Sequence, residues 1–332
     1  MRNSIFTLVV LFLLVTVAAL TLQADNHVEV IRAFDESPAY LPEGVTMDAD
    51  GNIYVSLGPP FFVGGGYGAL LQISPDGTET VLVEYPEGPA LAGLTVDSEG
   101  GVYFALPNPG QPDVGVYRVT DDGAERIPGT ENMVVPNGLA FDDEGNLYAT
   151  DSILGSIWRM APDGSSEAEP WISHELLMGC SEEDAVGANG IALWEGGFYV
   201  ANTANGLLVY VPILEDGGAG EPEVIAGDPE CNAGEELYAM DGIALDEAGN
   251  VYALLVLQHK LVVIDPDDGT HELLLDEEDG LWNAASLVFG ALEENRESLF
   301  IANYAVLPPE PENNLGPAVL KFEVGTPGLS LS

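Results

Sequence analysis

The stretch VPNGLAFDDEGNLYATD, residues 135 to 151, decides the fold of this chain. It reads as a short apolar strand, a D-x-x-G-N turn and a second apolar strand. The Asn-Gly pair at its start is, taken alone, the ordinary sign of a tight turn. Asn137 therefore has two interpretations: it is a turn residue, or its side chain is placed for a function.

The same pattern recurs along the chain at near-equal intervals. The related stretches begin at Glu43, Ala92, Asn137, Asn189, Asp241 and Ala285, which lie 49, 45, 52, 52 and 44 residues apart. Periods of this length are typical of propellers and solenoids. Each unit reads as four short strands, with a second tight turn before the last one, such as APDG at 161–164. Four strands in roughly 45 residues make one blade, so the six units predict an all-β, six-bladed β-propeller.

The two ends of the chain predict how the ring closes. The sixth unit ends with the strand AVLKFEV at 318–324 and has no outer strand of its own. The stretch HVEVIRAF at 27–34 alternates like an edge strand and is expected to complete that blade, which would leave no free sheet edge. The predicted organisation is a signal peptide at 1–24, the propeller at 25–326 and a C-terminal tail at 327–332.

The first residues predict export. Arg2 precedes an almost uninterrupted apolar run over 5–22, and Ala24 is a small residue suited to cleavage. We therefore expect a secreted or periplasmic protein. The apolar run is longer than the usual ~7–15 residues, so an uncleaved N-terminal anchor is the alternative. No later segment is apolar enough to span a membrane.

The charge excludes some partners. Lys and Arg number 8 against 55 Asp and Glu, which gives a formal net charge of −47. Such a chain does not bind the phosphates of nucleic acids, and anionic membranes repel it. The acidity fits either a surface kept soluble by self-repulsion or adaptation to a salty exterior. We expect a monomer whose partner is a small molecule.

The two cysteines predict a disulfide at the rim of the propeller. Cys180 precedes Asn189 by nine residues and Cys231 precedes Asp241 by ten, so they lie in equivalent loops of adjacent blades. An exported chain favours their oxidation. Free thiols are the alternative.

The residues that open the repeats predict a metal site. The innermost strand of each blade lines the axis of a propeller, so equivalent strand starts form a ring at one mouth of the channel. Four ring positions carry side-chain oxygens, and these are Glu43, Asn137, Asn189 and Asp241. Two carboxylates that converge without partners are costly, and a divalent cation would balance them. A donor set of oxygens alone favours Ca²⁺, with another divalent cation as the alternative. Caps and turns that coincide by chance are the competing interpretation.

The DADGN turn at 48–52 also resembles the start of an EF-hand loop. Its twelfth position is Pro59, where calcium binding needs a bidentate Glu. The same turn recurs in other units, so we interpret it as a hairpin.

The EG…NG…NG…DG series on a six-bladed propeller resembles the senescence marker protein/gluconolactonase/luciferin-regenerating enzyme family. Diisopropyl fluorophosphatase and the paraoxonases share its general plan. The resemblance spans roughly residues 27–324 and implies that Glu43, Asn137, Asn189 and Asp241 hold a catalytic Ca²⁺. It also implies that Asp241 is the general base or nucleophile. The histidine pair of the paraoxonases and the sugar-contacting arginine of the gluconolactonases are not recognisable in this sequence.

The function that follows is an exported, calcium-dependent, lactonase-like hydrolase of small esters, lactones first and phosphotriesters second. A non-catalytic propeller that binds a ligand or a protein partner is the alternative, and a synthase or lyase is a third. Around the mouth, His174 and His259 are candidates for proton shuttles or substrate contacts, against exposed loop histidines. Candidate pocket walls, against packing between blades, are Phe61, Phe62 and Trp282. Candidate groups that orient the ligands, against loop caps, are Asp151, Asn202 and Asn303.

Overall fold

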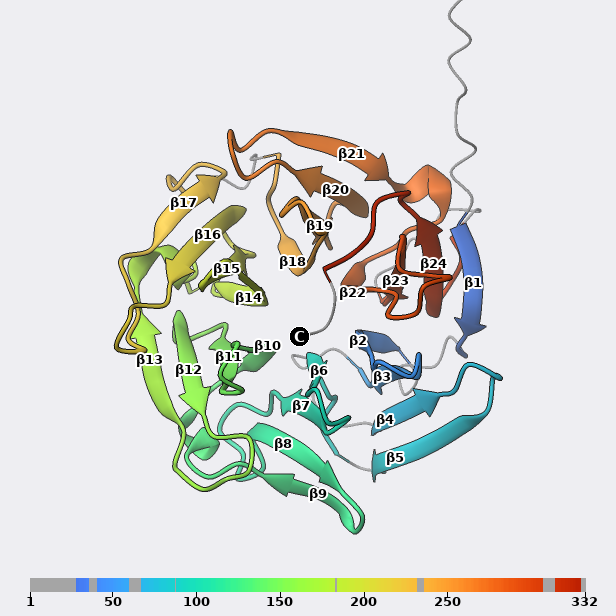
Figure 1. Ribbon diagram of the computed structural model, residues 1–332, viewed down its shortest axis with the longest axis horizontal. Helices are drawn as coiled ribbons and strands as arrows, with labels where there is room; N and C mark the ends of the chain where they lie inside the picture. The colour runs from blue at the N-terminus through green and yellow to red at the C-terminus, as the bar shows by residue number, and fades with distance from the viewer. Residues whose placement is uncertain are drawn as a thin grey trace, which may run out of the picture.

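Six four-stranded antiparallel sheets surround a central axis in the computed structural model of the chain (Figure 1). The structure describes residues 28–35, 41–59, 67–86, 88–182, 184–231, 236–306 and 314–329. The predicted signal peptide at 1–24 lies outside the described residues. The sequence-based prediction of an all-β, six-bladed propeller is confirmed.

Each blade runs from an innermost strand at the axis to an outermost strand at the perimeter. Blade 1 comprises β2 (Pro42–Met47), β3 (Ile53–Leu57), β4 (Gly68–Ile73) and β5 (Glu79–Tyr85). Blade 2 comprises β6 (Leu94–Val96), β7 (Val102–Leu106), β8 (Gly115–Thr120) and β9 (Gly123–Arg126). Blade 3 comprises β10 (Pro136–Phe141), β11 (Leu147–Asp151), β12 (Ser156–Met160) and β13 (Glu169–Ser173).

The second half of the ring repeats this order. Blade 4 comprises β14 (Ala188–Trp194), β15 (Gly197–Asn202), β16 (Leu207–Pro212) and β17 (Glu223–Ala226). Blade 5 comprises β18 (Met240–Leu245), β19 (Val251–Leu255), β20 (Lys260–Ile264) and β21 (His271–Leu275). Blade 6 comprises β22 (Ala284–Phe289), β23 (Ser298–Asn303), β24 (Ala318–Glu323) and β1 (Val28–Ala33). Short 3₁₀ turns lie in loops at Thr130–Asn132, Glu175–Leu177 and Glu277–Asp279.

The ring closes through the N-terminal strand, as predicted from its alternating pattern. β1 pairs with β24 in antiparallel register from Val28 opposite Phe322 to Ala33 opposite Ala318. Both ends of the chain therefore contribute to blade 6, and opening the ring would require this ladder to separate.

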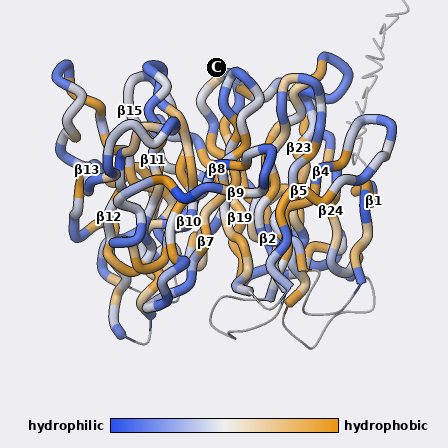
Figure 2. The backbone as a smooth tube through the Cα atoms, turned by 90° about the horizontal axis from the view of Figure 1, so that it is seen from below, coloured by the Kyte–Doolittle hydropathy of each residue, from blue (hydrophilic) through white to orange (hydrophobic). Residues whose placement is uncertain are grey.

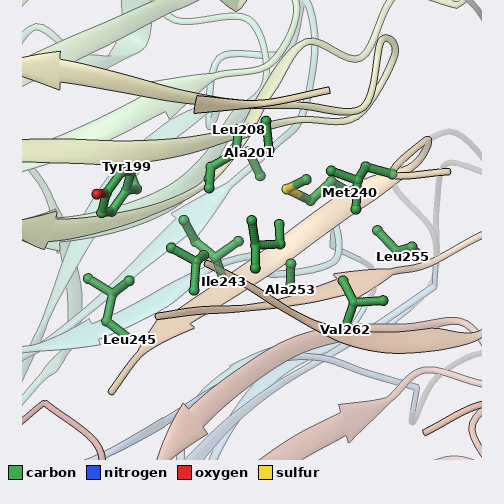
Figure 3. Close-up of a cluster of buried hydrophobic side chains, with 13 residues drawn as sticks. Tyr199, Ala201, Leu208, Met240, Ile243, Leu245, Ala253, Leu255 and Val262 are labelled. Atoms are coloured by element: carbon green, nitrogen blue, oxygen red, sulfur yellow. The ribbon is translucent and has the colours of Figure 1, made fainter. Parts of the chain in front are cut away.

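The core lies between blades rather than at the axis. One cluster packs Tyr199 and Leu208 of blade 4 against Ile243 and Val262 of blade 5 (Figure 3). Apolar residues run along the strands, whereas hydrophilic residues gather in the loops at both ends (Figure 2). This distribution follows from strands that are covered by a neighbouring blade on each face.

The segment after β24 reaches the end of the channel opposite the ring residues. The N–H of Gly328 donates to the carbonyl of Arg296 at 2.8 Å, and that of Leu329 donates to the carbonyl of Leu245 at 2.9 Å. Leu329 lines the cavity at the axis. The described part of this segment thus ties blade 6 to blade 5 at the far mouth. In the described residues no helix has the length and apolar character needed to cross a bilayer.

The D-x-x-G-N turns are hairpin turns held by their aspartates, including the DADGN turn at 48–52. In blade 3, Asp142 accepts hydrogen bonds from the backbone N–H groups of Glu144 and Asn146, at 3.0 and 2.8 Å. Its second oxygen accepts from the Asn146 amide at 2.7 Å and from the hydroxyl of buried Tyr148 at 3.1 Å. Asp48 and Asp246 make the same four bonds in their blades. Each aspartate therefore links its turn to a core tyrosine.

Asp142→Ala is expected to lower the free energy of unfolding by about 2–3 kcal/mol, because it leaves the Tyr148 hydroxyl and two turn N–H groups without an acceptor. Asp143→Ala is the matched control, since Asp143 is adjacent, exposed and of the same charge. Urea unfolding monitored by circular dichroism measures both. Equal stability of the two variants would show that the turn aspartate is dispensable.

Candidate functional site

The axis holds a cavity of about 550 Å³. Its lining includes the residues at the start of the inner strands, and the four predicted ligands Glu43, Asn137, Asn189 and Asp241 are all among them. Ala285 also lines it, on blade 6. Asn189 is buried, and the other three are partly exposed to the channel. The structure thus gathers around one axis four oxygen-bearing side chains that are far apart in sequence.

A β-bulge places each of these side chains. In blade 3, Pro136 pairs with Asp151 and Leu139 pairs with Ala149, so Asn137 and Gly138 together oppose Thr150 alone. The register shifts at the equivalent point of β2, β14 and β18, which carry Glu43, Asn189 and Asp241. A bulge bends its strand and redirects the side chain of the extra residue. The ring residues therefore leave the alternation of their strands and face the channel.

The glycine after each ring residue is required by close approach of backbones, not by a turn. A Cβ on Gly138 would lie 2.4 Å from the carbonyl oxygen of Asn189, and one on Gly190 would lie 2.4 Å from that of Asp241. Neither glycine has a positive φ, whereas Gly145 of the neighbouring hairpin has φ 81°. The turn interpretation of the Asn137–Gly138 pair is therefore excluded.

Hydroxyl groups fix the orientation of the two asparagine amides. The Asn137 Nδ2 donates to Ser152 Oγ at 3.2 Å, and Ser152 Oγ donates to the carbonyl of Ala188 at 2.7 Å. In the next blade, the Asn189 Nδ2 donates to Thr203 Oγ1 at 3.0 Å, which donates to the carbonyl of Met240 at 2.8 Å. Because each hydroxyl gives its proton to a carbonyl, it can only accept from the amide. Both amide oxygens are thereby left to the channel.

The surroundings of Glu43 and Asp241 disfavour the charged form of both carboxyl groups. Burial, and then the charge of Asp241, raise the pKa of Glu43 well above its ordinary value. Burial raises the pKa of Asp241 to about 7, although the Asn189 amide opposes this through hydrogen bonding. Oε2 of Glu43 is buried and has no hydrogen-bond partner in the described part of the chain. Without a counter-charge, the ring favours protonated carboxyl groups.

These residues fit a hard divalent cation. The donor set is two carboxylates and two amide oxygens, which are ligands that Ca²⁺ accepts. A cation would also satisfy the Glu43 oxygen that has no partner among the described residues, and it would offset the burial that raises the pKa of both carboxyl groups. Across the described ranges, no group of three or more His, Cys, Asp or Glu side chains gathers as a metal site. The candidate depends on the amides as well as the acids.

The residues that end the second strands act as loop caps. Asp151 accepts from the N–H groups of Val134 and Val135, at 2.6 and 3.2 Å. Asn202 donates to the carbonyls of Leu176 and Met178 in the loop that leads into β14. Asn303 accepts from the N–H of Trp282. Of the two roles expected for these residues, the cap is the one found. The hydroxyl groups that hold the Asn137 and Asn189 amides come one position later, at Ser152 and Thr203.

The structure also shows where His174, His259 and Trp282, which were expected around the mouth, lie. His174 accepts the N–H of Leu176 through Nδ1, and His259 stacks on Trp282 with ring centroids 3.7 Å apart and accepts the N–H of Asn283. Burial lowers the pKa of His259. Neither histidine is among the described residues that line the cavity. Trp282 is buried, and Phe61 and Phe62 lie outside the described residues.

The predicted disulfide is present. Cys180 and Cys231 are bonded, with their Cα atoms 5.6 Å apart. The bond joins the loops that lead into β14 and β18, and so it connects the two blades that carry Asn189 and Asp241. A disulfide is typical of an oxidising environment.

No protein-family model and no curated protein sequence matches the chain. Solved structures do match. A luciferin-regenerating enzyme aligns with a TM-score of 0.64 at 14% identity, covering 92% of this chain and 97% of that one. A gluconolactonase from Xanthomonas campestris aligns with a TM-score of 0.62 at 19% identity, covering 90% and 89%. An auxiliary nutrient binding protein from Bacteroides thetaiotaomicron aligns with a TM-score of 0.64 at 11% identity, covering 89% and 75%.

The chain is therefore a six-bladed propeller that structurally matches the luciferin-regenerating enzyme and gluconolactonase type, as the sequence resemblance suggested. At these identities the likeness concerns the fold. The same fold serves catalytic and binding proteins among these neighbours, so the function has to be argued from the ring residues.

Metal-free protein is expected to lose stability as the pH rises from about 4 to about 7. The folded-state pKa of Asp241 exceeds its ordinary value of 3.8 and reaches about 7, so the folded state binds more protons than the unfolded state in this window. The free energy of unfolding should fall by at most about 4 kcal/mol, because a shift of about three pKa units corresponds to about 1.4 kcal/mol per unit. Screening by solvent in the channel makes the decrease smaller than this upper bound.

Asp241→Asn should remove this part of the pH dependence, whereas the exposed Asp143→Asn should retain it. Chemical unfolding of protein treated with a chelator, at several values of pH, measures the difference. Parallel pH profiles for the wild type and Asp241→Asn would contradict the raised pKa of Asp241.

Proposed function

We propose that the chain is an exported hydrolase of small esters, lactones above all, that depends on a divalent cation, Ca²⁺ first. The observation that carries the proposal is the buried Oε2 of Glu43, which has no hydrogen-bond partner among the described residues and shares the ring of strand starts with Asp241 and two oriented amide oxygens. The proposal of export is supported by the signal-like sequence at 1–24 and by the disulfide.

The residues that would hold the cation are Glu43, Asn137, Asn189 and Asp241. A bound Ca²⁺ would supply Lewis-acid polarisation of the substrate's acyl oxygen. Four protein oxygens leave coordination positions free, because Ca²⁺ takes 6–8 oxygens. The site is therefore open in the manner of a catalytic centre rather than closed like a structural one.

Asp241 is the proposed general base. Its carboxylate takes a proton from the attacking water while the water oxygen bonds to the acyl carbon. The carboxylic acid so formed then gives the proton to the leaving alkoxide as the ester C–O bond breaks. Asn189, which lies within hydrogen-bonding reach of Asp241, holds the carboxylate in place. The net reaction adds water across the ester bond and returns Asp241 to its starting state.

The first test is Asp241→Asn in the full chain. The variant should retain Ca²⁺, since an amide oxygen replaces a carboxylate oxygen, but its kcat for lactones should fall at least about 100-fold, the usual range for a lost general base. Elemental analysis measures the metal and proton release measures turnover. Full activity in this variant would end the role assigned to Asp241. Bound Ca²⁺ in a wild type that hydrolyses no ester would favour the alternative of a ligand-binding propeller.

The second test is Ser152→Ala, which frees the Asn137 amide to rotate. The Kd for Ca²⁺ should rise about 10- to 100-fold, the range found when a group that orients a ligand is removed. Because both changes act through one ligand, Asn137→Ala combined with Ser152→Ala should cost little more than Asn137→Ala alone. Calorimetric titration with Ca²⁺ measures this, with the exposed Ser165→Ala as the control. Unchanged Ca²⁺ affinity in both Asn137→Ala and Ser152→Ala would remove the metal site.

A further inference from the structure

Three blades place a hydroxyl-bearing residue directly after their second strand. Ser152 follows β11, Thr203 follows β15 and Tyr304 follows β23. The first two hydroxyls are engaged, because each donates to a carbonyl of the next blade. The Tyr304 hydroxyl makes no hydrogen bond with another described residue. Its position in the repeat is thus that of Ser152 and Thr203, but no described residue accepts its proton.

The surroundings of Tyr304 direct it to the ring. The side chain is 8% exposed and packs against Leu41, Val306 and Ala285. Ala285 is the ring residue of blade 6, and its methyl group occupies little of the space that a ligand side chain fills in blades 3 to 5. Blade 6 lies between blade 5, which carries Asp241, and blade 1, which carries Glu43. Tyr304 therefore packs on Ala285, next to the sector that this small residue leaves open, although it is not itself among the described residues that line the cavity.

The electrostatics agree with this placement. Burial is the larger cause that raises the pKa of Tyr304, and the charges of Glu43 and Asp241 add to it. The phenol thus lies within the electrostatic influence of both carboxylates, in agreement with its packing on Ala285. Buried tyrosines normally find a hydrogen-bond partner, whereas phenylalanine serves where packing alone is needed.

We infer that Tyr304 is a substrate-binding residue of the site, and that its O–H donates a hydrogen bond to the acyl oxygen of the bound ester. This inference rests on the proposed function. As water adds to the acyl carbon, the electron pair of the C=O bond moves to that oxygen, and the hydrogen bond strengthens with the developing charge. Tyr304 keeps its proton throughout, since Asp241 carries the proton transfers.

Tyr304→Phe tests the inference, because it removes the hydroxyl and keeps the ring that packs on Leu41 and Ala285. With δ-valerolactone at saturating Ca²⁺, kcat/KM should fall about 10- to 1,000-fold, mostly in kcat, as for the loss of one oxyanion donor. Binding of δ-valerolactam, which has the carbonyl but is not turned over, should weaken about fivefold, as one hydrogen bond predicts. The Kd for Ca²⁺ should stay within twofold of the wild type. Tyr117→Phe is the control, since its hydroxyl donates to the carbonyl of Asp113, away from the ring.

Three other outcomes would each contradict a different part of this inference. Wild-type rates and lactam affinity in Tyr304→Phe would overturn the role of Tyr304 and leave the hydrolase intact. A loss of Ca²⁺ affinity in step with activity would show that Tyr304 supports the cation and not the substrate. A wild type that binds Ca²⁺ but turns over no ester would overturn the proposed function, and with it this inference, and that failure would be seen before any variant is made.

Discussion

The structure depends on how closely the inner strands approach one another at the axis. In five blades a glycine follows the first residue of the repeat, namely Gly44, Gly93, Gly138, Gly190 and Gly242. A Cβ on any of them would lie 2.3–2.7 Å from the backbone carbonyl oxygen of the equivalent first residue in the next blade. Only glycine permits this contact, and in blades 1, 3, 4 and 5 the bulge beside it turns the preceding side chain into the channel. Blade 6 has Ser286 at this position, and its hydroxyl accepts the N–H of Val45 from blade 1. The glycine contacts thus bring together the inner strands of blades 1 to 6, and the Ser286 contact joins blade 6 to blade 1.

The repeat made the fold predictable, because its period, turn aspartates and apolar strands all point to one blade. The ring positions were predictable for the same reason, since equivalent residues of a symmetric fold must converge. The bulges were not, because an Asn-Gly pair has the same letters in a hairpin turn and in a bulge. Ser152 and Thr203 were missed because their role depends on a carbonyl of the next blade, although both follow a strand end at matching distance from Asn137 and Asn189. Tyr304 carries no motif, and only its packing on Ala285 relates it to the ring.

The acidity of the chain and the chemistry of the ring are connected. A formal net charge of −47 concentrates cations near the surface and repels anions. Inside the ring, the same sign of charge is confined where water is scarce, so protonation or a cation has to balance it. The surface therefore favours loading of the proposed site with a cation, and it disfavours anionic substrates. A neutral ester or lactone carries no charge that the acidic surface would repel.

The proposed ligands also lie on both sides of the closure of the ring. Glu43 lies in blade 1, which follows β1 in the chain. Asp241 lies in blade 5, which precedes β22 to β24. A cation held by both would link the two sides at the axis, while the β1–β24 ladder links them at the perimeter. The disulfide joins the loops that lead into blades 4 and 5, which supply Asn189 and Asp241. A cation held by Glu43 and Asp241 would therefore add the free energy of its binding to the stability of the closed propeller.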